Sequence, residues 1–466
     1  MFQVVKNSPK PLGDQLVEEV TALIECGRLT EGFRLPSVRE LARRSGVSVY
    51  TASAAFDRLH ARGLIESRRG SGYFVARQRR YLETASIELG PPPSADPVLG
   101  FTRSSLGAPH VAVPAGCGFL PASWFADAIL PSMFSKFGRA AAAAMPAPIQ
   151  GDPQLLDLLV EKLHVAGIPA APRNVVVTFG ASQAFDLIAR SVLAPGDTVL
   201  VDDPGYFVLP SQLRAHRVHI VPVPRLADGS ALDVLEEVVR LHRPKIFFTQ
   251  TLLHNPTGTT ASAANCHGVL KIADKYNFLI VEDHVYSDLG PPHLMSLAQI
   301  DELRRVIYVG SFSKVLSPGI RIGFAAAPDG LIRQLIEAKI LTALTGSALD
   351  EFIVREVLAS GKYRKYIGRL RDRLTKARSF TIRMLRTAGL TAENPADGGL
   401  FLWAQLPTSV EAVALAQEAR GAGILLAPGS MFSLSGGAND RLRFNAAYGT
   451  DPSLVQFLSE RCKGRA

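Results

Sequence analysis

The chain has 466 residues, of which 47% are hydrophobic and 20% charged, which excludes global disorder and allows large buried cores. Its net charge is +9, and residues 1–80 carry 14 Lys/Arg against 8 Asp/Glu, an excess of six that predicts a polyanionic partner for this end. No apolar run approaches the ~18 residues of a spanning helix, and the first residues lack an apolar signal core, so we expect a cytoplasmic protein without a membrane partner.

The four cysteines are far apart in the sequence and include no CxxC pair. No histidine stands near them at the spacing of a metal ligand. We therefore predict reduced thiols and no structural metal site.

The first predicted domain, residues 1–76, has the pattern of a winged helix-turn-helix. Apolar residues recur at helical spacing over residues 12–24. A second helix begins after Ser37, which forms a predicted capping box with Glu40, and Ser48 is the predicted N-cap of a third helix. Residues 64–75 then read as strand, glycine-rich turn and strand, which predicts a hairpin.

Residues 77–112 are predicted to be a linker. The segment is first charged and then proline-rich, and its apolar residues show little periodicity. Such a composition favours an extended connection between two folded domains.

From residue 113 to residue 466, apolar strands alternate with amphipathic helices. This alternation predicts an α/β domain with a mostly parallel, doubly wound sheet. Long helices are predicted after about residue 330, and a smaller α/β segment follows near the C-terminus. The strands predicted for the large sheet are Val175–Phe179, Thr198–Asp202, His219–Val223, Ile246–Thr249, Leu279–Glu282, Val306–Val309 and Ile322–Ala326. Those of the smaller segment are Gly399–Gln405, Ile424–Leu426 and Arg441–Ala446.

The strongest chemical motif surrounds Lys314. Ser311 and Ser313 precede this lysine within three residues, and Arg321 follows on the way into another strand. A lysine amine can form a Schiff base with an aldehyde, while hydroxyl groups and a guanidinium bind a phosphate. The motif therefore predicts a cofactor that carries both an aldehyde and a phosphate.

Two further motifs suit a pyridine ring bound at the same place. Asp283 ends a predicted strand, and an acid opposite a pyridine nitrogen keeps that nitrogen protonated. Tyr286, three residues later, and Asn255, in an Asn-Pro-Thr-Gly turn, can both reach the ring's 3-oxygen. Each motif has a simpler interpretation as a turn or strand end, but their joint order favours a cofactor site.

Two more segments complete this predicted site. Residues Gly180, Ala181 and Ser182 lie between a strand and a helix, where backbone amides and a helix N-terminus can hold a phosphate. Tyr206 follows another strand and can stack on the ring. All these positions fall at the carboxyl ends of strands, which is where open α/β sheets bind ligands.

In these motifs, residues 113–466 resemble fold-type I pyridoxal-phosphate enzymes of the aminotransferase kind. The resemblance implies pyridoxal 5'-phosphate on Lys314, with Asp283 as the partner of the ring nitrogen. It also implies an arginine that binds a substrate or effector carboxylate. Arg443 matches that position because Phe444-Asn445-Ala446 continues the family's pattern, and Arg441 is the competing choice.

Residues 10–76 resemble the GntR-type winged helix, which binds double-stranded DNA. The resemblance rests on the runs Gly32–Ala42, Gly46–Ser48 and Arg68–Val75. The residues expected to contact DNA are Arg34, Ser37, Arg39, Ser48, Tyr50, Thr51, Ser53, Arg68, Arg69, Gly70 and Ser71.

The third helix departs from the GntR pattern at the positions that usually carry arginines. Val49 and Ser53 stand there, and Tyr50 replaces a small residue. Direct readout of guanine by arginine from this helix is therefore weakened. Base recognition rests either on Tyr50 with Thr51 and Ser53, or on Arg39 and the wing, which is the hairpin predicted at residues 64–75.

A GntR-like winged helix joined to an aminotransferase-like domain resembles the MocR subfamily of regulators. The resemblance implies a homodimer with head-to-tail swapped domains. We hypothesise a transcription regulator, either repressor or activator, whose operator binding changes when an amine or amino-acid effector exchanges onto the cofactor as an external aldimine. Two alternatives stay open: an active aminotransferase with a vestigial or merely targeting N-terminal domain, and a sensor of pyridoxal phosphate itself. Any activity of the regulator would be limited to a half-transamination.

Overall fold

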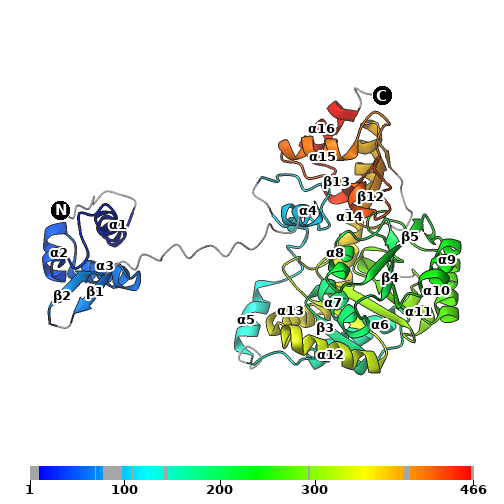
Figure 1. Cartoon of the computed structure of the whole chain (residues 1–466), viewed down its shortest axis with the longest axis horizontal. Coiled ribbons are helices and arrows are strands. Elements are labelled where there is room, and N and C mark those ends of the chain that lie inside the picture. Colours follow the sequence, from blue (N-terminus) through cyan, green and yellow to red (C-terminus); the bar gives the residue numbers. More distant parts are fainter. Residues whose placement is uncertain are drawn as a thin grey trace. The chain divides into compact units, whose positions relative to one another are not determined.

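The protein, represented by a computed structural model, divides into two compact units, Met1–Ser94 and Ala95–Ala466 (Figure 1). The structure describes residues 10–68, 70–76, 97–107, 110–140, 145–291, 294–392 and 398–462. In these ranges, none of the helices is both long enough and apolar enough to cross a membrane.

The N-terminal unit is a winged helix-turn-helix built around one small core. Its elements are α1 (Leu12–Glu25), α2 (Val38–Ser45), α3 (Val49–Ala61), β1 (Ile65–Arg68) and β2 (Gly72–Val75). The two strands are antiparallel and pair Ile65 with Val75 and Arg68 with Gly72. Leu16 from α1 and Phe56 from α3 are fully buried in this core, so the helices pack on the apolar faces that their sequences predict.

The two predicted N-caps are present, but the capping box is not closed. The Ser37 hydroxyl accepts a hydrogen bond from the Glu40 amide, and the Ser48 hydroxyl accepts one from the Thr51 amide at 3.0 Å. The Glu40 carboxylate instead binds Arg43 at 2.8 Å and Arg44 at 2.6 Å. Their guanidinium groups lower the pKa of Glu40 to about 2. The prediction that this carboxylate caps the helix was wrong, because two cations within one helical turn compete for it.

The larger unit contains an eight-stranded mixed sheet in its described residues, with the order β3-β10-β9-β8-β7-β4-β5-β6. The middle strands are parallel, whereas β10 runs antiparallel to both neighbours and β6 runs antiparallel to β5. The strands are β3 (Val175–Thr178), β4 (Thr198–Asp203), β5 (His219–Leu226), β6 (Gly229–Ser230), β7 (Ile246–Thr249), β8 (Leu279–Asp283), β9 (Val306–Ser311) and β10 (Gly323–Ala326).

Helices cover both faces of this sheet, and each face has its own core. Successive residues of β3 alternate between them, since Val175 and Val177 belong to one core and Val176 to the other. The core with Val176 is covered by α7 (Gly180–Val192), α8 (Val208–Arg214) and α12 (Asp329–Ala343) (Figure 1). The opposite core includes residues of α6 (Pro153–Val165), α9 (Leu232–His242), α10 (Ala263–Tyr276), α11 (Leu297–Asp301), α13 (Ala348–Ala359) and α14 (Tyr363–Thr387).

A second, antiparallel sheet lies near the C-terminus with the order β11-β12-β14-β13. Its strands are β11 (Thr391–Ala392), β12 (Phe401–Gln405), β13 (Ala427–Pro428) and β14 (Arg441–Asn445). The helices α5 (Pro131–Arg139), α15 (Ala412–Gly421) and α16 (Pro452–Cys462) complete the unit. The strand predicted at Ile424–Leu426 is displaced to β13, and only Ile424 of that segment forms a bridge, to Val113.

Helix α4 (Pro97–Ser105) lies inside the segment predicted to be a linker. Its Phe101 is 4% exposed and packs in one cluster with Trp403, Leu425 and Phe432. The larger unit therefore starts before residue 113, the boundary expected from the sequence. A short helix fixed by one aromatic residue leaves too little periodicity for the sequence to reveal it.

Candidate functional site

A cavity of about 100 Å³ lies at the carboxyl ends of the strands in the large sheet, and we call it the Lys314 cavity. Of the cofactor residues predicted from the sequence, all but Gly180 line it. Phe119, Phe185 and Val285 line it as well. The predicted residues in the lining are Ala181, Ser182, Tyr206, Asn255, Asp283, Tyr286, Ser311, Ser313, Lys314 and Arg321. Five separate segments of the chain, each at or just after a strand end, thus bring these residues together.

Lys314 extends into this cavity with its amine held by backbone and aromatic groups. Its Nζ donates to the Gly118 carbonyl at 3.1 Å and lies 3.9 Å from the centre of the Phe119 ring. Burial lowers the pKa of Lys314 to about 8, and the nearby Arg443 cation adds to this effect. Roughly a tenth of the amine is therefore neutral at pH 7, which is the form that attacks an aldehyde.

Asp283 is the last residue of β8, and Tyr286 lies on the loop that follows it. The Asp283 carboxylate accepts the Val285 amide at 3.1 Å, and burial raises the pKa of Asp283 to about 6. This acid is therefore mostly ionised at neutral pH and able to pair with a protonated ring nitrogen. Burial raises the pKa of Tyr286 well above its usual value, so its phenol stays protonated and can donate.

The loop before α7 and Arg321 form a cradle suited to an anion. Gly180 has φ +71°, and a Cβ placed on it would lie 2.7 Å from Arg321 Nη2. Arg321 Nη1 donates to the Ser313 hydroxyl at 2.9 Å, and the Ser311 hydroxyl accepts the Ser313 amide at 3.2 Å. A guanidinium beside hydroxyls and a helix N-terminus fits a phosphate group, so these residues fit pyridoxal phosphate.

Tyr206 follows β4 and forms one wall of the Lys314 cavity. Its phenol is hydrogen-bonded to the Ser182 side chain, while burial raises the pKa of Tyr206 to about 12. The position beside Asp283 allows the ring to stack on a planar ligand.

Arg443 does not line the Lys314 cavity but lies directly behind Asn255. The guanidinium is 1% exposed and donates to Asn255 Oδ1 at 2.6 Å and to the Gly116 carbonyl at 2.5 Å. Its Nε has no hydrogen-bond partner among the described residues. Burial lowers the pKa of Arg443 to about 10, so it remains a cation. Arg441, the competing choice, begins the same strand and is half-buried.

A layer of polar residues that the sequence did not reveal supports this arrangement. Asp202 accepts the Gln250 amide at 3.0 Å, and Gln250 Oε1 accepts the Asn255 amide at 2.6 Å. Gly116 and Gly118 supply carbonyls to Arg443 and Lys314. Two glycines within the apolar run 113–120 were the one sequence signal available, since isolated glycines often mark close backbone contacts. A Cβ on Gly116 would in fact lie 2.5 Å from the Ala427 nitrogen.

The DNA-contact residues predicted in the N-terminal unit are mostly exposed. Arg34, Arg39 and Ser48 are exposed, and Tyr50 at the start of α3 is 84% exposed. Ser37, Arg68, Gly70 and Ser71 are also exposed, whereas Thr51 and Ser53 are half-buried on α3. Arg69 lies outside the described residues.

Arg68 is the predicted contact residue whose guanidinium already has partners. It pairs with Glu66 at 2.7 Å and lies 4.5 Å from the centre of the Phe74 ring. Contact with a phosphate would therefore compete with an existing ion pair.

Two family models match the chain, one for each unit. Residues 12–75 match the bacterial regulatory proteins of the gntR family. Residues 137–460 match the aminotransferase class I and II family, whose domains typically bind pyridoxal phosphate.

Relatives of similar length are named as regulators. The chain is 28% identical to an uncharacterized HTH-type transcriptional regulator of Bacillus subtilis, YdfD, over 96% of this chain and 94% of that protein. It is 26% identical to the probable rhizopine catabolism regulatory protein MocR of Rhizobium meliloti, over 92% of this chain and 88% of that protein. A 2-aminoadipate transaminase of Thermus thermophilus is 30% identical over 68% of this chain and 83% of that enzyme.

Solved structures resemble the larger unit. The α-aminoadipate aminotransferase LysN from Thermus thermophilus, complexed with N-(5'-phosphopyridoxyl)-L-leucine, matches with a TM-score of 0.71 and 26% identity. The match covers 78% of this chain and 94% of LysN. An archaeal alanine:glyoxylate aminotransferase matches with a TM-score of 0.74 at 24% identity, over 80% of this chain and 95% of that one, which shows a shared fold.

Proposed function

Since the chain belongs to the aminotransferase class I and II family and joins that domain to a gntR-family helix-turn-helix, as in MocR-type transcriptional regulators, we propose that it regulates transcription in response to pyridoxal phosphate and a small amine or amino acid. One observation carries the proposal: ten predicted cofactor residues line a single cavity of a chain that also has a DNA-binding unit.

Pyridoxal phosphate supplies an aldehyde that condenses with primary amines and a ring that accepts electrons. Lys314 offers the amine for this condensation, in a pocket that keeps part of it neutral. Asp283 would hold a proton on the ring nitrogen, and Tyr286 and Asn255 would bind the ring's 3-oxygen. Tyr206 would pack on the ring face. Arg321, Ser311, Ser313 and the turn Gly180–Ser182 would hold the phosphate.

The Lys314 side chain would hold the cofactor through its amine, and an amine effector would compete with that amine for the aldehyde. Arg443 binds the carboxylate of an amino-acid effector, for which its Nε has an unused donor. Asn255 accepts a hydrogen bond from Arg443 and also lines the Lys314 cavity. An effector bound to the arginine would therefore also affect the position of Asn255 in that cavity. The effector changes DNA binding only in so far as it binds two states of the protein differently.

The exposed face of the N-terminal unit makes the contacts with DNA. The N-termini of α2 and α3 with Arg34, Arg39 and the wing hold phosphates, and Tyr50 reaches a base edge. We also infer a homodimer with head-to-tail swapped domains, because a two-fold pair of such units reads two half-sites of an operator. Light scattering of the full chain tests this inference, and a monomer at micromolar concentration would contradict it.

Genomic DNA recovered with the full-length protein tests the regulator function. We expect a few enriched fragments that share a repeated half-site and are lost in an Arg39→Ala/Tyr50→Ala double variant. Recovery of DNA without sequence enrichment, or no recovery, would contradict the proposal.

A second candidate function, amino transfer, is favoured by the completeness of the Lys314 cavity and by the similarity to named transaminases. Sustained transfer between an amino acid and an oxo acid, measured over many turnovers, would support this function. A single half-reaction, or none, supports the regulator.

A further inference from the structure

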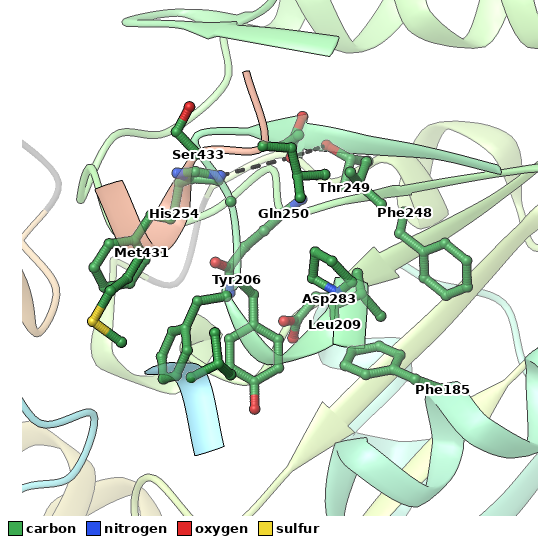
Figure 2. A pocket seen from close by; sticks show the side chains of 18 of the residues that line it. Phe185, Tyr206, Leu209, Phe248, Thr249, Gln250, His254, Asp283, Met431 and Ser433 are labelled. Carbon is green, nitrogen blue, oxygen red and sulfur yellow. Dashed lines mark hydrogen bonds and ion pairs between the residues drawn. The ribbon is translucent and has the colours of Figure 1, made fainter. Parts of the chain in front are cut away.

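We propose that a second cavity, which shares a wall with the Lys314 cavity, binds a small neutral aromatic molecule through a carbonyl oxygen. We call it the α4 cavity, because Pro97 and Val98 of that helix form part of it. Its volume is about 300 Å³, three times that of the Lys314 cavity and within the range of small-molecule sites. Figure 2 shows it between Phe185, Tyr206, Leu209 and Met431.

Aromatic and aliphatic side chains make most of the wall. They come from the large sheet, from α7 and α8, from α4, and from the turn at η5 (Gly429–Phe432). The apolar residues are Val98, Phe185, Val201, Tyr206, Phe207, Leu209, Phe248, Val281, Met431, Phe432 and Leu434. Five of these are aromatic, so a flat aromatic ring finds ring faces and edges to pack against.

Gln250 lines this apolar space and carries an unused hydrogen-bond donor. The residue is 5% exposed, and its Nε2 has no partner among the described residues. Its Oε1 accepts the Asn255 amide at 2.6 Å, and since that amide can only donate, the orientation of the side-chain amide is fixed. A buried donor without a partner is costly, so a ligand that offers an acceptor here gains a full hydrogen bond.

The neighbouring polar groups are already engaged. The Asp202 carboxylate accepts hydrogen bonds from Thr249 at 2.8 Å and from the Gln250 backbone amide. His254 Nδ1 lies 2.9 Å from the Thr257 hydroxyl. Among these groups, the Gln250 amide is the free anchor for a ligand.

The charges around the cavity favour a neutral ligand. The Asp283 carboxylate lines it, is mostly ionised at neutral pH and repels an anion, whereas its cationic residue, Arg214, is exposed and screened by water. An aromatic amide or ketone therefore fits better than an aromatic carboxylate.

A ligand in the α4 cavity would contact residues of the Lys314 cavity as well as helix α4. Tyr206 and Asp283 belong to both cavities, so an occupant restricts the ring and the acid that the proposed function assigns to the cofactor. Val98 belongs to α4, the first described helix after the segment that leads from the N-terminal unit. The effect of an occupant on the cofactor rests on the proposed function, whereas the binding of a ligand in the α4 cavity does not.

Titration calorimetry of the full chain with benzamide, without added pyridoxal phosphate, tests the site directly. We expect saturable binding of one benzamide per chain with a Kd on the order of 1 mM. Benzoate, which has the same ring and a negative charge, should bind at least tenfold more weakly. Equal or tighter binding of benzoate would overturn the assignment of a neutral ligand.

Two variants and a matched control locate the binding. Val98→Phe fills the cavity from α4, and Gln250→Glu keeps the acceptor for Asn255 but removes the donor, so each should weaken benzamide binding at least tenfold. Leu99→Phe introduces the same aromatic side chain at the exposed neighbour on α4 and should bind like the wild type. The proposal is overturned if benzamide does not bind, or if Val98→Phe and Gln250→Glu both bind like Leu99→Phe.

Added pyridoxal phosphate separates this result from the function of the Lys314 cavity. We expect the Kd for benzamide to change and to reach a limiting value once pyridoxal phosphate saturates the Lys314 cavity. A Kd that rises in proportion to cofactor concentration means that benzamide occupies the Lys314 cavity, which overturns the second site. If pyridoxal phosphate has no effect because it does not bind, the proposed function fails while the α4 cavity stands.

Discussion

The Lys314 cavity and the exposed face of the N-terminal unit place their functional groups in opposite surroundings. Around Lys314, burial shifts the pKa values of Lys314, Asp283 and Tyr286, and both Lys314 and Asp283 have a fixed hydrogen-bond partner. On the N-terminal unit, Arg39 and Tyr50 extend into solvent.

This difference shows how far the fold itself orients the functional groups of each region before a ligand binds. A buried cavity binds its ligand with groups that are already oriented, so single substitutions there should have large effects. An exposed face gains its contacts only with DNA, and each contact contributes a modest share. Substitutions in the two regions should therefore differ in the size of their effects.

The largest expected effect is the loss of covalent cofactor attachment in Lys314→Ala. After borohydride reduction with pyridoxal phosphate, peptide mass spectrometry should find the label at Lys314 of the wild type and none in the variant. Lys362→Ala removes an exposed lysine at the start of α14 and should be labelled like the wild type. Labelling of Lys314→Ala at another lysine to the same extent would refute the assignment.

Arg443→Gln should weaken the binding of an amino-acid effector about a hundredfold, because a buried charge-assisted hydrogen bond contributes about 1.5–3 kcal/mol. Binding of the matching amine without a carboxylate, measured by calorimetry, should change much less. Arg441→Gln is the control, and the roles of the two arginines are reversed if Arg441→Gln shows the larger loss.

The pH dependence of cofactor attachment should follow the lowered pKa of Lys314. Only the neutral amine attacks, so the rate should rise with pH and level off above pH about 8. The Asp283 carboxylate raises the pKa of Lys314, so Asp283→Asn should move the levelling point to lower pH. Stopped-flow absorbance measures this profile, with exposed Asp372→Asn as the control. A profile shifted upward in Asp283→Asn would contradict the account.

Arg39→Ala should weaken DNA binding about tenfold and reduce the dependence of log K on log salt by about one, the share of one phosphate contact. Arg43→Ala, whose guanidinium already pairs with Glu40, should reduce that slope less. Tyr50→Ala should change the preferred sequence and leave the slope unchanged. Fluorescence anisotropy at several salt concentrations tests all three, and equal slopes in Arg39→Ala and wild type would exclude the phosphate contact.

Ser48→Ala should have the smallest effect, a loss of about 1 kcal/mol in the stability of α3, because its hydroxyl caps the Thr51 amide. Hydrogen exchange of the α3 amides in the full chain measures this loss. Ser48→Asn should restore protection, and unchanged exchange in Ser48→Ala would show that the cap contributes nothing.

The sequence predicted the residues that would bind the cofactor better than the residues that hold them in place. Lys314 and Arg321 stand in one continuous motif, and Asp283 and Tyr206 follow apolar strands, so local patterns place them. Gly118 and Gln250 come from segments with no chemical motif, and only the folded chain brings them to Lys314 and Asn255. The α4 cavity is likewise invisible in sequence, because its wall is assembled from six separate segments.

The fold shows the same division. Strands of the large sheet were predicted within a few residues because their apolar runs are long and buried. The helix around Phe101 was assigned to a linker, since its only strong determinant is contact with Trp403 and Phe432 far along the chain. The unclosed capping box at Glu40 reflects competition by Arg43 and Arg44, which the capping pattern does not consider.

The central claim is that events at Lys314 change DNA binding. Its most direct test is the affinity and footprint of the full-length protein on recovered operator DNA, with and without pyridoxal phosphate, for the wild type and Lys314→Ala. The account predicts that the cofactor changes the affinity or the footprint of the wild type and leaves those of Lys314→Ala unchanged. Identical affinities and footprints in all four measurements would contradict it.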